Sequence, residues 1–146
     1  MKKILVPVDF SSVTDAALRT ATTLAGALQA ELILIHIAAP EPEFVGYETG
    51  PASVRTAVAH QLAGEHKRLQ ELQHALEGKS LRVTALLIQG YTVEKILAEA
   101  TRLAADLIVM GSHGHGGLHH LLMGSVAEGV VRKAPCPVVL VPAARA

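Results

Sequence analysis

The sequence predicts an α/β domain in which helices cover both faces of an open parallel sheet of five strands. Apolar runs alternate with amphipathic segments along the 146 residues, the pattern of repeated strand–helix–strand units. Most of these runs are continuous, as expected for strands buried on both faces. The length suits one domain with its own core, so we expect a single domain over residues 1–146.

The N-terminal part predicts a strand, a helix and a second strand. Residues 4–8 and residues 32–37 are the two apolar runs. Between them, apolar residues recur at helical spacing from Ala17 to Leu28 and predict a helix. Ser12 and Asp15 have the spacing of a capping box, so we expect the helix to begin there.

A long loop and a second helix are expected next. Prolines, glycines and glutamates gather in residues 38–52 and predict the loop. Apolar residues from Val54 to Leu76 mark the helix, and Gly78 is expected to end it. Its histidines at positions 60, 66 and 74 are expected on the solvated face.

The remaining elements repeat the alternation. Residues 81–87 alternate as a third strand, and Thr92 is placed to cap a third helix that runs to Leu103. Residues 107–110 predict the fourth strand, 125–133 the fourth helix and 138–141 the last strand. Pro135 stops the fourth helix because proline cannot continue it.

Bulk properties exclude several classes of function. The formal net charge is zero, so no basic field can attract nucleic acid or an anionic membrane, and we expect neither as a partner. No apolar run is long enough to span a bilayer. The one cysteine, Cys136, is interpreted as a small buried hydrophobe, and the lack of a disulfide framework favours a reducing, cytoplasmic location.

A spaced glycine motif is the most informative feature of the chain. Gly111 and Gly114 follow the fourth strand, and Gly124 and Ser125 come nine residues later, where Ser125 and Glu128 form a capping box. Glycines let the backbone approach a ligand and permit positive φ, and a helix N-terminus attracts anions. We therefore expect a phosphate site, with the Ser125 hydroxyl on a phosphate oxygen; the alternative for an isolated pair of glycines is a plain turn.

Histidines in the same loop admit two interpretations. His113 and His115 either contact the phosphate or face solvent. His115 and His119 are four residues apart, a spacing that binds metal on a helix. No cysteine lies nearby, so we assign no metal ligand here.

Asp9 is placed to meet this loop. Open α/β sheets bind ligands beyond the carboxyl ends of the strands where the winding reverses. In the strand order 3-2-1-4-5 that point lies between the strands that end at Asp9 and Gly111. One interpretation is that Asp9 accepts hydrogen bonds from ribose hydroxyls or helps to hold a metal. The other is that it only caps the turn that follows it. The sequence lacks a Walker lysine motif, a dinucleotide fingerprint in its first turn and a nucleophile elbow.

These segments resemble the universal stress protein family over essentially the full chain. Residues 3–9 look like the family's first strand and residues 105–114 like its fourth. The family's ATP-binding subset carries G-x2-G-x9-G-[ST], which Gly111, Gly114, Gly124 and Ser125 match without a gap. The resemblance implies a Rossmann-like fold with strand order 3-2-1-4-5, ATP at the ends of the first and fourth strands, and a dimer through the last strand.

The same resemblance implies roles for further residues. Pro7, Val8 and Asp9 are expected beside the nucleoside, with the backbone of Ile37 on the adenine. Met110 is expected to border this pocket and Val126 to donate its backbone N–H to phosphate. Because Glu128 would bring a negative charge near the phosphates, we expect Mg²⁺ or Mn²⁺ to accompany ATP.

The sequence thus predicts an ATP-binding regulatory protein of the stress response, cytoplasmic and homodimeric through residues 138–141. The apolar last strand at the edge of the sheet favours pairing with a second copy. The protein partner is unknown. Two alternatives stay open: a slow ATPase that uses the same pocket, and a dimeric scaffold whose pocket is empty or takes another adenine nucleotide. The segment from Gly111 to Ser125, which we call the glycine loop, lacks a lysine, a strong base and an arginine finger, which disfavours fast hydrolysis.

Overall fold

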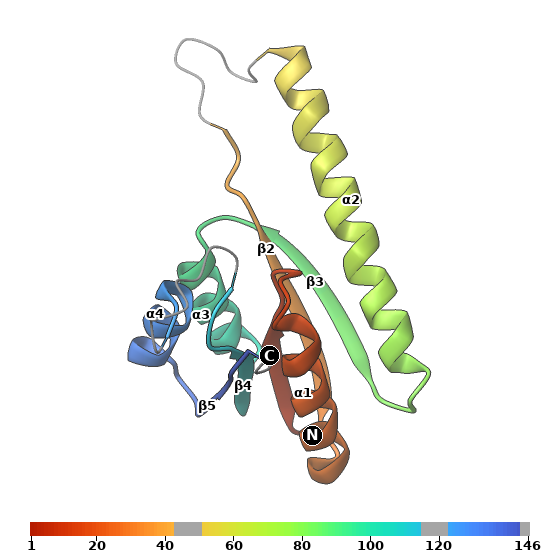
Figure 1. Cartoon of the computed structure of the whole chain (residues 1–146), viewed down its shortest axis with the longest axis vertical. Coiled ribbons are helices and arrows are strands. Elements are labelled where there is room, and N and C mark those ends of the chain that lie inside the picture. Colours follow the sequence, from red (N-terminus) through yellow and green to blue (C-terminus); the bar gives the residue numbers. More distant parts are fainter. Residues whose placement is uncertain (43–50, 115–122, 144–146) are drawn as a thin grey trace.

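A computed structural model describes residues 1–42, 51–114 and 123–143 (Figure 1). Most of the predicted 38–52 loop, together with His115, His119 and His120, lies outside the described residues. The predicted elements are all present. They are, in chain order, β1 (Lys3–Pro7), α1 (Thr14–Leu28), β2 (Glu31–Ala38), α2 (Ala52–Glu77), β3 (Val83–Gln89), α3 (Thr92–Arg102), β4 (Leu107–Gly111), α4 (Ser125–Lys133) and β5 (Val138–Val141).

The five strands form one parallel sheet in the order β3-β2-β1-β4-β5, as predicted. The chain winds outward from β1 to β3, then crosses over and adds β4 and β5 on the other side of β1. The winding therefore reverses between β1 and β4, and their carboxyl ends face a shared crevice.

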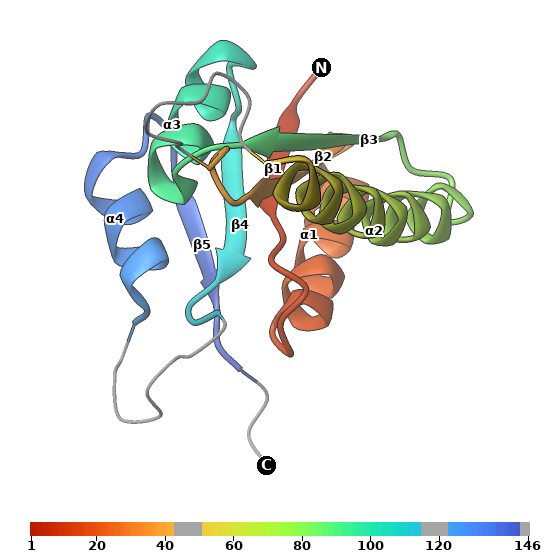
Figure 2. The same ribbon diagram turned by 90° about the horizontal axis from the view of Figure 1, so that it is seen from above.

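The sheet separates two apolar cores, because side chains of one strand alternate between its faces. On one face, α1 and α2 cover residues that include Ile4, Val6 and Leu34. On the other, α3 and α4 cover residues that include Leu5 and Ile108. Figure 2 shows the two helix pairs on opposite sides of the sheet.

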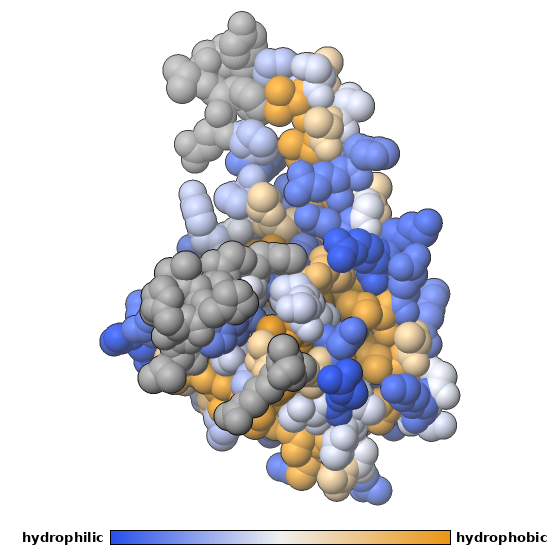
Figure 3. Space-filling model, viewed as in Figure 1, coloured by the Kyte–Doolittle hydropathy of each residue, from blue (hydrophilic) through white to orange (hydrophobic). Residues whose placement is uncertain are grey.

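The surface along α2 is polar. Figure 3 shows hydrophilic residues along the outer side of this helix, and its histidines at 60, 66 and 74 are exposed, as predicted. The C-terminal half of α2 contacts the sheet through Leu69 and Leu76, which are buried, and the helix ends at Gly78. Within the described residues, no helix is both long and apolar enough to cross a bilayer.

The predicted side-chain caps are wrong. The residue before α1 is Val13, the residue before α3 is Tyr91 and the residue before α4 is Gly124, and none of them makes a capping bond through its side chain. Thr92 and Ser125 are instead the first residues of their helices. At α1, Thr14 donates its backbone N–H to the carbonyl oxygen of Ser11 and its hydroxyl to Asp9, so the turn is closed without the Ser12 side chain.

Candidate functional site

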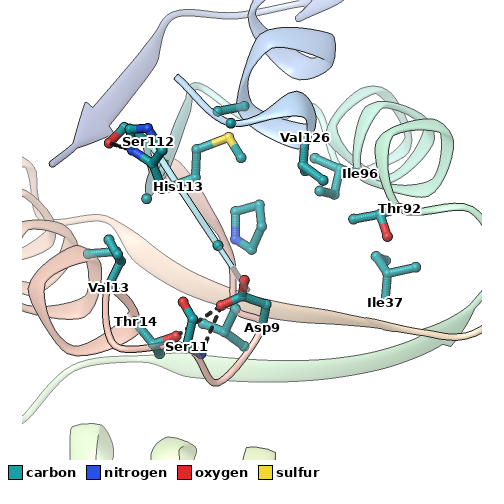
Figure 4. A pocket seen from close by; sticks show the side chains of 18 of the residues that line it. Asp9, Ser11, Val13, Thr14, Ile37, Thr92, Ile96, Ser112, His113 and Val126 are labelled. Atoms are coloured by element: carbon teal, nitrogen blue, oxygen red, sulfur yellow. Dashed lines mark hydrogen bonds between the residues drawn. The ribbon is translucent and has the colours of Figure 1, made fainter. Parts of the chain in front are cut away.

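A cavity of about 420 Å³ opens at the carboxyl ends of β1 and β4, where the winding of the sheet reverses (Figure 4). The β1–α1 turn, the end of β2, the start of α3, the β4 loop and the first turn of α4 contribute to its wall. The predicted site residues on this wall are Pro7, Val8, Asp9, Ile37, Met110, Gly111, His113, Gly114, Gly124, Ser125 and Val126. His115 lies outside the described residues.

Asp9 joins the two halves of the site. Its Oδ1 accepts the backbone N–H of Ser11 at 3.0 Å and the hydroxyl of Thr14 at 3.4 Å. Its Oδ2 lies where a side chain on Gly114 would begin, so the carboxylate rests against the backbone of the β4 loop. Asp9 therefore caps its own turn, which agrees with the simpler of its two sequence interpretations, and its second oxygen faces the glycine loop.

The glycines of the motif are required by close contacts. A Cβ on Gly111 would lie 2.6 Å from Val13 Cγ1, and one on Gly124 would lie 3.3 Å from the carbonyl oxygen of Ser112. None of the three motif glycines has a positive φ, so the left-handed backbone that glycine permits is not used at these positions. Because these glycines have no side chain, the loop after β4 can pack directly against Val13 and the Asp9 carboxylate.

The N-terminus of α4 faces the cavity. Ser125, Val126 and Ala127 line the wall, and the first N–H groups of a helix have no partner within it. Glu128 does not approach this end: its Oε1 accepts Arg132 Nη2 at 2.8 Å across one turn of the helix. The expected repulsion between Glu128 and phosphate is thereby reduced, and the positive helix end is available to an anion.

The two sides of the cavity differ in chemistry. Figure 4 shows Ile37, Ile96 and Val126 on one side, together with Thr92. The opposite side carries polar groups that include Asp9, Ser11, Thr14, Ser112 and His113. One side therefore suits a flat apolar group, and the other suits hydroxyl and phosphate oxygens.

Ser112 and His113 form a pair at the polar side. The Ser112 hydroxyl lies 2.9 Å from His113 Nδ1, and Ser112 is buried while its carbonyl oxygen accepts the N–H of Gly124 at 2.7 Å. The bond between Ser112 and Gly124 closes the loop onto the start of α4. No group of three or more metal-ligating side chains occurs among the residues that the structure describes.

Sequence reasoning missed several residues of the wall. They include Ser11, Thr14, His36, Thr92 and Ser112. The Ser11 hydroxyl oxygen is shielded from water and has no hydrogen-bond partner among the described residues. Proximity to Asp9 and Gly111 was the available signal for Ser11 and Ser112, whereas His36 and Thr92 become part of the site only when the strands are assembled.

The described wall contains no lysine and no arginine. An anionic ligand would be met by backbone N–H groups, the α4 helix end and any cation that it brings. A phosphorylated ligand fits this wall chemically. The wall combines a loop of glycines, the Ser11 hydroxyl, which has no hydrogen-bond partner among the described residues, and the N-terminus of α4.

Comparison with known proteins places the chain in a family. The sequence profile of the Universal stress protein family matches residues 1–142. A universal stress protein of Thermus aquaticus is 38% identical over 140 residues, covering 96% of this chain and 98% of the relative. The solved structure of MJ0577, a universal stress protein of Methanocaldococcus jannaschii, is 30% identical and covers 99% of this chain and 98% of its own, with a TM-score of 0.81.

The fold also occurs in the crystal structure of a universal stress protein in complex with cAMP. That protein is 22% identical, covers 98% of this chain and 98% of its own, and has a TM-score of 0.68. At this identity the likeness concerns the fold. The profile match and the relatives in Thermus and Methanocaldococcus show that this chain belongs to the universal stress protein family.

Proposed function

We propose that this chain binds ATP, accompanied by Mg²⁺ or Mn²⁺, and acts as a regulatory protein rather than as a fast enzyme. The observation that carries the proposal is the cradle at the polar end of the cavity. There Gly111, Gly114 and Gly124 line the wall and pack closely against Val13, Asp9 and Ser112, which brings the loop that they form beside the N-terminus of α4. The proposal treats residues 1–146 as one nucleotide-binding domain.

The two sides of the cavity suit the two ends of a nucleotide. The adenine is assigned to the side of Ile37, with Met110 bordering the pocket, and the ribose to Asp9, beside Pro7 and Val8. The triphosphate is assigned to the glycine loop, with the Ser125 hydroxyl and the Val126 N–H as donors. His113 is adjacent to this end, and His115 is proposed with it.

A divalent cation follows from the charge of the wall. Because the described lining residues contain no lysine or arginine, the charge of a triphosphate is only partly met by backbone groups and the helix end. Mg²⁺ binds through phosphate oxygens with few protein ligands, which fits this wall. We expect EDTA to weaken ATP binding about tenfold or more, a change of about 1.4 kcal/mol.

The test is to identify the ligand directly. Mass spectrometry of small molecules released from the purified, denatured protein is expected to find ATP, and calorimetry is expected to rank ATP above GTP and cAMP. A preference for cAMP would favour the alternative of another adenine nucleotide, by analogy with the relative solved with cAMP. Binding of neither adenine nucleotide would contradict the proposal and favour a scaffold with an empty pocket.

Hydrolysis is expected to be slow or absent. Binding that stabilises ATP and the transition state equally does not accelerate the reaction, and the lining residues that the structure describes offer no arginine or lysine to the developing charge. Single-turnover assays at saturating ATP should give rates far below the roughly 1–10³ s⁻¹ of ordinary enzymes. Turnover of about 10 s⁻¹ that a Gly114→Ala variant abolishes would instead place the protein among ATPases.

We also propose a cytoplasmic homodimer, with the copies joined along β5. This strand lies at the edge of the sheet, and Val138, Val139 and Leu140 remain partly exposed. An apolar edge strand favours association unless it is paired or covered.

A further inference from the structure

A buried histidine and a partly buried glutamate meet behind the cavity. His36 belongs to β2 and Glu65 to α2, and His36 Nε2 lies 3.3 Å from Glu65 Oε2. Both atoms are shielded from water, and neither has a hydrogen-bond partner among the described residues, so the contact between them is an ion-pair distance only. Glu65 does not line the cavity, whereas His36 does.

The hydrogen bonds of His36 fix where its proton must be. Its Nδ1 lies 2.8 Å from the carbonyl oxygen of Val8. A carbonyl oxygen only accepts, so Nδ1 carries a proton and donates it. In a neutral ring Nε2 would then present a lone pair to Glu65 Oε2. Two facing lone pairs repel, so the contact at 3.3 Å is attractive only when a second proton lies between His36 and Glu65.

Glu65 is itself oriented by its own helix. Gln61 Nε2 donates to Glu65 Oε1 at 3.2 Å, four residues earlier on α2. This bond occupies one carboxylate oxygen and turns the other toward His36. The chain of contacts Gln61–Glu65–His36–Val8 thus connects α2 to the end of β1.

The end of β1 is the part of the site that this chain of contacts holds. Val8 lines the cavity and precedes Asp9, whose carboxylate contacts the glycine loop. Val8 is fixed on both sides, since its N–H donates to the carbonyl oxygen of Ile35 at 2.9 Å and its own carbonyl accepts from His36.

A second contact from α2 reaches the same turn. Phe10 has a φ of 60°, a left-handed conformation that is costly for an aromatic residue. Its ring lies 4.6 Å from the His36 ring, and the Arg68 guanidinium carbon lies 4.3 Å from its centroid. Glu65 and Arg68 are three residues apart on α2, so one face of the helix holds both His36 and Phe10 around Asp9.

We infer that Glu65 is a positioning residue of the nucleotide site and acts through His36. By contacting the Nε2 edge of His36, it holds the ring in the orientation in which Nδ1–H donates to the Val8 carbonyl, and so holds Asp9 against the glycine loop. This inference rests on the proposed nucleotide function for its effect on affinity, but the proton arrangement is independent of any ligand.

Two substitutions of Glu65 separate its hydrogen-bonding role toward His36 from its negative charge. In Glu65→Gln, the side-chain oxygen still accepts from Gln61, so the amide NH₂ faces His36 and donates to Nε2. His36 then keeps its Nδ1–H, and ATP affinity should stay within about twofold of the unaltered chain. In Glu65→Leu, Nε2 has no donor, the ring can turn, and ATP affinity should fall about tenfold, equivalent to about 1.4 kcal/mol. Glu71→Leu, at an exposed position of the same helix, is the matched control and should change neither.

The readouts are calorimetry with Mg-ATP, ¹⁵N NMR of the His36 ring and the backbone amide signals of Asp9 and Ser11. The unaltered chain should show a protonated Nδ1, as should Glu65→Gln, whereas Glu65→Leu should lose this signature and shift the Asp9 and Ser11 amides. These amide shifts test the positioning even if the unaltered chain binds no ATP, which would refute only the proposed function. A purely structural role predicts that Glu65→Leu lowers the unfolding temperature with unchanged amides, ring signature and affinity. That result, or an unprotonated Nδ1 in the unaltered chain, overturns the inference.

Discussion

At the scale of single residues, Gly114 is the position where the β4 loop and the β1–α1 turn touch. A Cβ there would overlap Asp9 Oδ2. The carboxylate would have to rotate away from Ser11 and Thr14, at a cost of about 1 kcal/mol for a lost hydrogen bond. We therefore expect Gly114→Ala to lower the free energy of unfolding by about that amount and ATP affinity by about tenfold.

Denaturant unfolding and calorimetry measure the two effects of Gly114→Ala. Gly26→Ala is the control, because a Cβ at this exposed position of α1 meets nothing within 4 Å. If folded Gly114→Ala binds ATP as tightly as the control, the glycine loop does not hold the phosphates.

Cys136 gives a second prediction at the residue scale. Partial burial raises the pKa of its thiol, and the nearby carboxylate of Asp106 raises this pKa further. Because the thiolate is the reactive form, alkylation by iodoacetamide at about pH 8 should be slower than for a cysteine in the unfolded chain, whose pKa is about 8.5. Asp106→Asn should speed the reaction by removing the charge.

The same raised pKa of Cys136 predicts how stability depends on pH. Between the unfolded pKa and the higher folded pKa, the folded chain binds more protons, so stability falls as pH rises. The contribution is fully present below the unfolded pKa of about 8.5. Cys136→Ala should remove this part of the alkaline decline in unfolding temperature; an identical decline in both proteins would contradict the assignment.

At the scale of elements, α3 and α4 approach each other at a glycine. A Cβ on Gly129 of α4 would lie 2.9 Å from Cγ2 of Val93 in α3. Valine is stiff about its first side-chain bond and yields little, so overpacking should cost about 1–3 kcal/mol. This outweighs the gain of about 0.5–1 kcal/mol from replacing a helical glycine with alanine.

Gly64 of α2 is the matched comparison, since a Cβ there meets nothing within 4 Å. We expect Gly64→Ala to raise the free energy of unfolding by about 0.5–1 kcal/mol, and Gly129→Ala to lower it. Chemical denaturation measures the free energy of unfolding of both variants. Stabilisation by Gly129→Ala would show that α3 and α4 have room for a methyl group where they cross, which contradicts the close contact with Val93.

At the scale of the whole molecule, the open edge at β5 determines how copies would associate. A two-fold axis would pair β5 with its own copy and remove the apolar edge from water. Val139→Lys should therefore shift the protein from dimer to monomer in light scattering. Val139 also contacts the core on the α1 side, so thermal unfolding must show that the variant is folded. A monomeric unaltered chain at high concentration would refute the dimer.

The sequence by itself determined the elements, whereas their order in the sheet, and with it the place of the cavity, followed from the resemblance to the family. Continuous apolar runs report strands buried on both faces, and the reversal of winding then requires a crevice between the ends of β1 and β4. Helix bounds at α4 and strand bounds at β5 agree with prediction to the residue, because Ser125 and the prolines around β5 interrupt regular structure locally.

Only the tertiary structure decided which groups meet. Asp9 caps its own turn through Ser11 and Thr14, and it rests on Gly114, which is 105 positions away along the chain. His36 finds Glu65 on a helix beyond the long loop. Hydrophobic periodicity indicates which face of an element is buried. Polar contacts instead depend on the distances that separate elements, and a change of a few tenths of an ångström makes or breaks them. Those distances are fixed by the packing of α1 and α2 on the sheet, and no local pattern in the sequence encodes them.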